Sequence, residues 1–263
     1  MYRSIRFKKS THGSAWLSLS VLAMAIATTA WQHAALGMPV LSGGAPADPP
    51  MRQTPQENTR AILNFENPPP HVFLDVPFTP QAPFDNWSDP YREACEEASV
   101  VMAMAWVRGD EPADGVIPPD QARAQILELI GFETYHFGYH NDTALRETAK
   151  LLTRHYRHPA AVFYDITPGN IRSALAAGNI MIVPVAGALL ENPYFASPPP
   201  YHMLVIHGYD DLTQEFITND PGTRSGANYR YPYATLWNAI HDWTGSDATI
   251  ANGRKGMIVV GRP

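Results

Sequence analysis

The sequence predicts an α+β domain in which a helix near the start of the domain packs on an antiparallel β-sheet. Apolar residues recur at helical spacing in the first part of the domain, between residues 89 and 155. From residue 160 onward the apolar residues come instead in short runs typical of strands. Of the 263 residues, 45% are hydrophobic and 17% charged, so a packed core is expected. Helices first and strands later along the chain are typical of this fold class.

The N-terminal segment, residues 1–37, reads as an export signal. Its first nine residues include four basic residues, Arg3, Arg6, Lys8 and Lys9. No charged residue follows between Ser10 and Ala47, and Ala15–Trp31 is mostly apolar. A basic head before an apolar stretch is typical of a signal peptide, and this stretch is also close to the length that spans a bilayer. We therefore expect an exported protein, either secreted after cleavage or anchored to the outer face of the cytoplasmic membrane.

The next segment, residues 38–70, is expected to be a linker because it is rich in Pro, Gly and Ala. Residues 71–263 then form the folded domain, and no internal repeat interrupts them. The whole chain carries 19 basic and 25 acidic residues, a formal net charge of −6. Nucleic acid is not an expected partner, because no basic cluster occurs outside the N-terminal segment. One cysteine excludes an intramolecular disulfide and leaves one thiol to explain.

The first elements of the domain are an extended segment and a helix. Residues 71–78 are an extended lead-in bounded by prolines. Asp89 is expected to cap the helix, Pro90 to be its first residue and Gly109 to stop it. One apolar face is predicted on this helix, made of Ala98, Val101, Met102, Ala105 and Trp106. This is the helix that we expect to pack on the sheet.

The remaining helices and strands are predicted from changes in the spacing of the apolar residues along the chain. Two more helices are expected, over residues 119–130 and from residue 141 or 142 to about 155. Residues 167–177 should form a helix ended by Gly178, and residues 233–243 another. Strands are predicted at residues 161–164, 180–185, 201–209, 215–219 and 256–260. The run 180–185 is continuously apolar, which favours a central strand, and residues 201–219 read as a hairpin.

Cys95 is the first candidate for chemistry, because it lies in the first turns of the predicted helix. A helix N-terminus lowers the pKa of a thiol, since its partial positive charge favours the thiolate. Glu96 and Glu97 suit the helix dipole, but their charges oppose thiolate formation. A base held against the sulfur would have to outweigh them. A lone cysteine is often only a small buried hydrophobic residue. The position of Cys95 alone therefore leaves open whether it is catalytic or part of the core.

A base for Cys95 is expected on the strand 201–209. His202 stands at its start, where a rigid strand would fix it well. His207 competes on the same strand, but five residues along it points to the opposite face, so only one of the two can face Cys95. Asn219 or Asp220, at the end of the returning strand, could orient the base, although these residues also form a turn signal.

An oxyanion donor would complete such a site. Gln81 lies before the helix in a proline-held segment, and its amide together with the backbone N–H of Cys95 could bind a developing oxyanion. No cofactor is expected. His136 and His140 are four residues apart, but Gly138 and the neighbouring aromatic residues favour a loop, so no metal site is predicted there.

In this order of Gln, Cys on a helix, His on a strand, and Asn or Asp after the next strand, the chain resembles the papain-like cysteine peptidases. In particular it resembles the bacteriocin double-glycine leader peptidase-like family and its stand-alone exported members. The matching segments are VPFTPQAPF at 76–84, CEEAS at 95–99, YHMLVIHGYD at 201–210 and NDPGT at 219–223. Together they span roughly residues 73–263.

The resemblance implies a role for each matched residue. Cys95 would be the nucleophile, His202 the general base and Gln81 the oxyanion donor. Asp220 would orient His202, in preference to Asn219, because the family places an Asp directly before the Pro. Many members carry a small residue after the cysteine, where this chain has Glu96.

The expected function is therefore that of an extracytoplasmic cysteine peptidase, which hydrolyses peptide or amide bonds through a Cys–His–Asp triad and a thioester intermediate. Its substrate would be a peptide, including the peptides of the cell wall, and the N-terminal segment could attach it to the membrane. Two alternatives stay open. The same triad could transfer the acyl group to an amine, as in a transamidase, or the domain could be a non-catalytic cell-surface binding module of the same fold.

Overall fold

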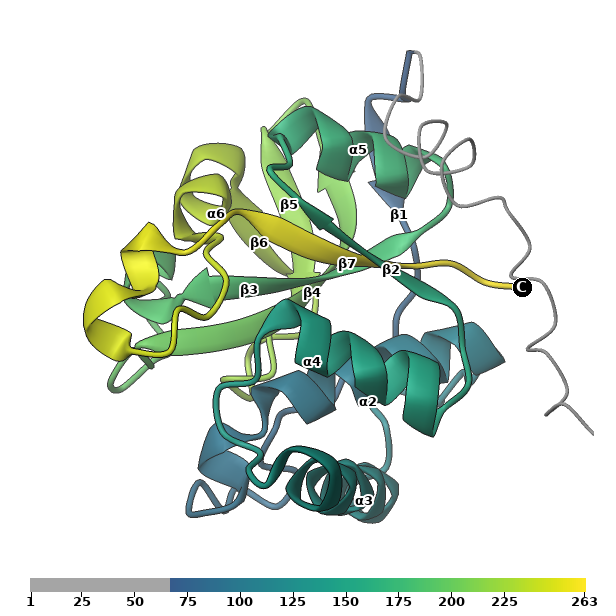
Figure 1. Cartoon of the computed structure of the whole chain (residues 1–263). Helices are drawn as coiled ribbons and strands as arrows, with labels where there is room; N and C mark the ends of the chain where they lie inside the picture. The colour runs from purple at the N-terminus through teal and green to yellow at the C-terminus, as the bar shows by residue number, and fades with distance from the viewer. Residues whose placement is uncertain (1–66) are drawn as a thin grey trace, which may run out of the picture. The chain divides into compact units, whose positions relative to one another are not determined.

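The computed structural model describes residues 67–263 (Figure 1). The expected signal or anchor, residues 1–37, and residues 38–66 of the expected linker lie outside the described residues. Across residues 67–263, no helix combines the length and the apolar character that crossing a membrane requires.

A seven-stranded sheet forms the centre of the domain. Its strands are β1 (His71–Phe73), β2 (Ala160–Tyr164), β3 (Ile180–Ala186), β4 (Tyr201–Asp210), β5 (Glu215–Asn219), β6 (Tyr229–Pro232) and β7 (Gly256–Val260). They are ordered β2-β7-β3-β4-β5-β6, β1 pairs with β4, and every pairing between these strands is antiparallel. The predicted antiparallel sheet is thus confirmed. β3 is buried along its whole length between β7 and β4, as its continuous apolar sequence predicts.

Helices cover both faces of this sheet. The helices are α2 (Cys95–Arg108), α3 (Pro119–Phe137), α4 (Leu145–Lys150), α5 (Pro168–Ala176) and α6 (Tyr233–Ala239). Short helical turns are η1 (Tyr91–Glu93), η2 (Leu151–His155), η3 (Gly187–Leu190) and η4 (Asp247–Asn252). Figure 1 shows α2, α3 and α4 on one side of the sheet and α5 and α6 on the other. Two apolar cores result, one on each face.

The helix α2 differs from its prediction in two ways. It begins at Cys95 and not at Pro90, because Ala94 has non-helical φ and ψ of −105° and 29° and separates α2 from the turn η1. It is also buried on every side from Cys95 to Trp106, where one apolar face was expected. The sheet covers one side, and α3 and α4 cover the other. Gly109 ends the helix in the left-handed region, as predicted.

Other boundaries also differ from the sequence prediction. α3 runs to Phe137, seven residues beyond the predicted end, and Gly138 is its C-cap. α6 ends at Ala239, so residues 240–243 are not helical. The strand β6 was not predicted, since its YRYP sequence ends in proline and shows no clear alternation.

Hydrogen bonds to Asp242 link the start of α4 to β2 and to the segment after α6. Asp242 Oδ1 accepts hydrogen bonds from the backbone N–H groups of Leu145 (2.9 Å) and Trp243 (2.8 Å), and its Oδ2 accepts one from the Tyr164 hydroxyl (2.6 Å). The Asp242 residue is only 6% exposed. This carboxylate satisfies one of the N–H groups that a helix start leaves without an intrahelical partner. It therefore positions the loop before α4, which reaches the site described next.

Candidate active site

A cleft of about 470 Å³ brings the predicted site residues together. Its lining is drawn from three stretches of chain, 81–96, 194–202 and 222–224, together with Asp142. Cys95, His202 and Gln81 all line it. The two sides of the cleft are linked at Gln81, whose backbone N–H donates to the carbonyl of Pro221 at 2.9 Å. Residues from the helical part and from the sheet thus meet at one surface.

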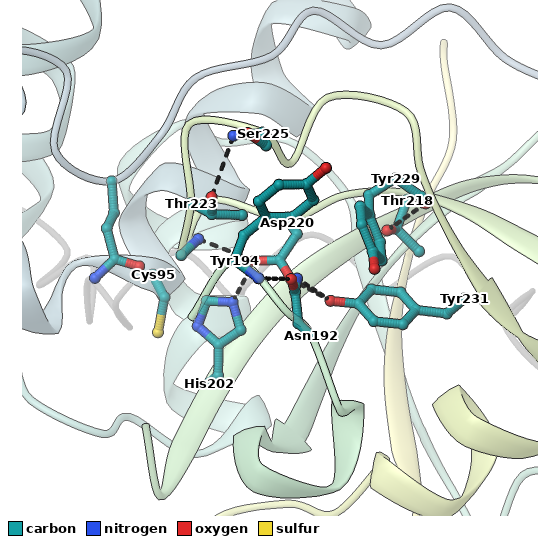
Figure 2. Close-up of polar contacts among 12 residues, drawn as sticks. Cys95, Asn192, Tyr194, His202, Thr218, Asp220, Thr223, Ser225, Tyr229 and Tyr231 are labelled. Atoms are coloured by element: carbon teal, nitrogen blue, oxygen red, sulfur yellow. Dashed lines mark hydrogen bonds and ion pairs between the residues drawn. The ribbon is translucent and has the colours of Figure 1, made fainter. Parts of the chain in front are cut away.

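Cys95 is the first residue of α2 and is 6% exposed. The break at Ala94 places its backbone N–H among the first N–H groups of the helix, which have no partner within the helix. Such groups can stabilise a negatively charged oxygen, because they carry the positive end of the helix dipole. The sulfur of Cys95 lies beside His202 in Figure 2. The position predicted for Cys95 at a helix start is therefore sharpened to the first residue.

His202 and Asp220 form a fully buried hydrogen-bonded pair. His202 is 1% exposed and Asp220 is not exposed, and His202 Nε2 lies 2.7 Å from Asp220 Oδ1. This bond leaves Nδ1 as the ring nitrogen that can exchange a proton with a partner, and Cys95 lies on the side of the ring away from Asp220 (Figure 2). A thiol, an imidazole and a carboxylate in this order can carry out nucleophilic acyl transfer.

Four donors hold the carboxylate of Asp220. Oδ1 accepts from His202 and from the backbone N–H of Gly222 (2.9 Å), and Oδ2 accepts from the Tyr231 hydroxyl (2.6 Å) and from Asn192 Nδ2 (3.3 Å). Asn192 also donates to the Tyr231 oxygen at 2.7 Å. Burial by itself raises the pKa of Asp220, but the charge of His202 and these hydrogen bonds outweigh it and lower the pKa below its ordinary value.

Asn192 and Tyr231 are thus site residues that the sequence did not reveal. Tyr231 lies on β6, the strand that was not predicted, and Asn192 lies in the loop after η3. Neither stands in a recognisable motif. An asparagine directly before a proline, and a tyrosine beside the returning strand, were the signals available.

Asn219 and His207, the alternatives to Asp220 and His202, have other partners. Asn219 donates from Nδ2 to the carbonyl of Val76 (2.8 Å) and accepts from the backbone N–H of Asn228, so it ties loops together and does not contact His202. His207 is fully buried, and its Nδ1 lies 2.7 Å from the carbonyl oxygen of Leu74. Burial lowers the pKa of His207 to about 4, so its imidazole is neutral at pH 7.

Gln81 reaches the cleft, but both of its amide hydrogens already have acceptors. Nε2 donates to the carbonyl oxygens of Tyr91 (2.9 Å) and Arg92 (2.8 Å). Within residues 67–263, its buried Oε1 accepts no hydrogen bond. In this conformation Gln81 braces the turn η1, which leads directly into Cys95. To donate to an oxyanion, it has to exchange one of the two carbonyls for that oxygen.

Buried acids surround the sulfur. Glu96 and Glu97 are both fully buried on α2, and Glu133 of α3 is buried near them. The thiol of Cys95 donates to Glu96 Oε2 across 3.0 Å. Burial raises the pKa of the Cys95 thiol, and the charges of Glu96, Glu97 and Asp142 raise it further. The prediction that the neighbouring glutamates oppose thiolate formation agrees with this geometry.

Aromatic residues and a glycine shape the walls of the cleft. Trp87, Tyr194 and Phe195 line it, and the Phe195 ring meets the His202 ring edge-on at 5.6 Å between centroids. Gly222 lies against both of these rings. A Cβ added at Gly222 would be 2.9 Å from His202 Cε1, 3.0 Å from its Nε2 and 2.8 Å from Phe195 Cε1. Only glycine leaves the His202 ring its present place.

No metal site accompanies these residues: the described part of the chain holds no group of three or more His, Cys, Asp and Glu side chains suited to a metal ion. His136 lies in the last turn of α3, where a loop was expected, and stacks on Phe132 at 4.2 Å between centroids. His140 follows the end of that helix.

Comparison with known proteins identifies the family of this chain. No curated protein matches the sequence. A solved structure assigned as a C39-like peptidase from Bacillus anthracis is 14% identical, with a TM-score of 0.47, and the match covers 73% of this chain and 98% of that one. Xylellain, a cysteine protease from Xylella fastidiosa, is 12% identical, with a TM-score of 0.42 and coverage of 74% and 87%. The family described as "Peptidase_C39 like family" matches residues 73–246, about two thirds of the chain. This chain therefore belongs to the C39-like peptidase family and is a cysteine peptidase with a papain-like α+β fold.

Proposed function

We propose that this protein is an extracytoplasmic peptidase that hydrolyses peptide or amide bonds with Cys95 as nucleophile, His202 as base and Asp220 as the residue that orients the base. The observation that carries the proposal is the buried bond of 2.7 Å between Asp220 Oδ1 and Nε2 of His202, a residue that lines the same cleft as Cys95. The bond fixes the ring so that Nδ1 is the nitrogen available to the thiol.

The reaction follows from this arrangement. The sulfur of Cys95 bonds to the carbonyl carbon of the substrate as its proton passes to His202 Nδ1, and the carbonyl electron pair moves to the oxygen. The backbone N–H of Cys95 donates to that oxyanion, and Gln81 adds a second donor when one of its N–H groups leaves its backbone carbonyl. His202 then protonates the leaving amine, so that a thioester remains. Water, deprotonated by His202, releases the acid and restores the thiol.

Asp220 supports each of these steps. As the imidazole becomes an imidazolium, the buried carboxylate 2.7 Å from Nε2 stabilises the positive charge. The four donors keep Asp220 ionised, which the reaction needs.

The substrate class is a peptide, and the peptides of the cell wall are the substrate that an exported enzyme would meet. Aromatic walls at Trp87, Tyr194 and Phe195 offer apolar surface to its side chains. Export, with or without a retained anchor, is proposed from the basic and then uncharged N-terminal segment. N-terminal sequencing of the protein recovered from cell fractions distinguishes a cleaved signal from an anchor.

The deciding experiment screens peptide and cell-wall fragment libraries with the wild type and with Cys95→Ala, using mass spectrometry of the products. Cleavage by the wild type alone supports the proposal, and His202→Ala should abolish it as well. His207→Gln is the matched control, since it alters a buried histidine of the same strand outside the cleft. Cleavage that survives Cys95→Ala would contradict the proposal. An added amine acceptor reveals transfer if the product carries the amine.

A further inference from the structure

Glu96 stands directly beside the nucleophile and uses both of its carboxyl oxygens. Oε2 accepts from the Cys95 sulfur at 3.0 Å, and Oε1 accepts from the backbone N–H of Thr143 at 3.0 Å. The side chain is fully buried and points inward from the first turn of α2. The thiol proton thus has an acceptor other than His202.

The contact is fixed from outside α2 as well. Thr143 is fully buried, its carbonyl accepts from the Tyr201 hydroxyl (3.1 Å), and its hydroxyl pairs with that of Thr148 (3.0 Å). Tyr201 belongs to β4, the strand that carries His202. Glu96 therefore cannot turn away from the sulfur without breaking its bond to Thr143, and Tyr201 of β4 holds Thr143 in place.

We propose that Glu96 holds Cys95 as a neutral thiol in the free enzyme, by accepting the S–H hydrogen bond in competition with His202. The proposal rests on the proposed function, in which Cys95 is the nucleophile. On attack, the proton moves from sulfur to His202 Nδ1 while the sulfur bonds to the substrate carbon, and Glu96 neither gains nor loses a proton.

The groups around Glu96 are acids on every element packed against it. Glu97 adjoins it on α2, Glu133 faces it from α3, Asp142 lies in the loop beside Thr143, and Tyr201 approaches from β4. Burial, with Glu93 and Asp247 nearby, raises the pKa of Asp142 to about 6. Such surroundings disfavour a second negative charge on the sulfur. Burial also raises the pKa of Glu96, while the hydrogen bond from Cys95 acts to lower it.

A protonated thiol protects the nucleophile. The thiolate is the form that alkylating agents and oxidants attack, and oxidation beyond the sulfenic acid is largely irreversible. Cys95 lines an open cleft, so it is within reach of such reagents. Glu96 would keep its reactivity low until a substrate occupies the cleft.

The test measures alkylation of Cys95 by iodoacetamide across pH in the full chain, for wild type, Glu96→Gln and Glu97→Gln. A glutamine at position 96 keeps an oxygen for Thr143 N–H and places an NH₂ donor against the sulfur. We expect Glu96→Gln to lower the pH of half-maximal alkylation by about one unit or more, which corresponds to roughly tenfold faster alkylation at pH 7. Glu97→Gln makes the same acid-to-amide change one residue away, at a side chain that does not contact the sulfur, and should shift the midpoint less. An unchanged or raised midpoint in Glu96→Gln overturns the proposal.

A measurement on the unmodified protein covers the case in which Glu96→Gln does not fold. The Raman S–H stretching band of Cys95, identified by its loss in Cys95→Ser, should be present at neutral pH at a frequency lowered by hydrogen bonding. Absence of this band in the wild type refutes the proposal. The proposed function is tested separately, since peptide cleavage that persists in Cys95→Ala contradicts that function and leaves the state of the thiol unaffected.

Discussion

The hydroxyl of Tyr231 is expected to set the lower pH limit of activity, because it holds the charge of Asp220. Tyr231 is 1% exposed, and its hydroxyl donates to Asp220 Oδ2 at 2.6 Å. Tyr231→Phe removes this donor with almost no change in volume. The same change deprives Asn192 of its acceptor at 2.7 Å, and only the longer bond of 3.3 Å from Asn192 to Oδ2 then remains.

The size of the effect follows from the charge on the acceptor. A hydrogen bond to a charged group contributes about 1.5–3 kcal/mol, which corresponds to about one to two pKa units. The charge of His202 and the hydrogen bonds now hold the pKa of Asp220 below its ordinary value, so the stability that this carboxylate contributes is present above the pKa of the unfolded chain. That stability is lost as the pH falls through the lower, folded pKa. In Tyr231→Phe the folded pKa rises, so the loss begins at higher pH.

The assay is the pH dependence of kcat/KM on a peptide identified in the screen, measured together with urea unfolding at each pH. We expect the acidic limit of activity to move up by about one to two pH units and the free energy of unfolding at pH 7 to fall by about 1.5–3 kcal/mol. Tyr229→Phe is the matched control, since within residues 67–263 its hydroxyl makes no hydrogen bond to another side chain or to the backbone. Equal pH profiles for Tyr231→Phe and wild type would refute the reasoning.

Three further changes have expected outcomes. Gly222→Ala should lower kcat/KM at least about tenfold, with the fold kept, because the new methyl group displaces the ring of His202; kinetics and circular dichroism check both parts. Asp242→Ala should lower the free energy of unfolding by about 3 kcal/mol, measured in urea, because it leaves buried donors without an acceptor. Glu133→Gln should flatten the pH dependence of stability. Burial raises the pKa of Glu133 to about 7, so the stability due to its bound proton, about 3 kcal/mol, is present below the unfolded pKa and is lost as the pH rises to about 7.

Each of these changes has a control and an outcome that counts against it. Gly131→Ala, at a helical glycine with nothing within 4 Å of the added Cβ, should leave kcat/KM unchanged, and an equal loss in both variants contradicts the steric argument. Asp165→Asn removes an exposed ion pair with Arg254 and keeps a residue type that tolerates the left-handed backbone of this position, so it should cost much less than Asp242→Ala. A wild-type stability that stays level between pH 5 and 8 contradicts the argument for Glu133.

The sequence was most informative where local chemistry decides the structure. The apolar run of β3, the hairpin of β4 and β5 and the glycine that ends α2 each follow from neighbouring residues, and the structure agrees with all three. The order of Gln81, Cys95, His202 and Asp220 was sufficient to predict one site. The structure places Gln81, Cys95 and His202 on one cleft, with Asp220 buried next to it and bonded to His202.

Long-range packing accounts for what the sequence did not show. α2 is buried on every side because α3 and α4 pack against the side that faces away from the sheet. The sequence of α2 contains no pattern from which this second layer could be predicted. The start of α2 at Cys95 depends on the backbone of Ala94, although alanine itself has the highest helix propensity. Trp87 lines the cleft, and no pattern in the neighbouring sequence distinguishes it from a core tryptophan. The roles of Asn192 and Tyr231 arise only when β6 folds against β5.

The contrast between the two walls of the cleft has a consequence for how this enzyme can diversify. One wall is α2, where nearly every side chain is packed on both sides, so substitutions there cost stability. The other wall includes the loop between η3 and β4, which is tied down at Asn192 and again where β4 begins, while Tyr194 between them is 57% exposed. A library that randomises Tyr194, Ala196 and Ser197, and keeps Phe195 against the His202 ring, should keep most members folded while changing which peptides they prefer. New specificities can therefore be selected on this scaffold without rebuilding its reactive centre.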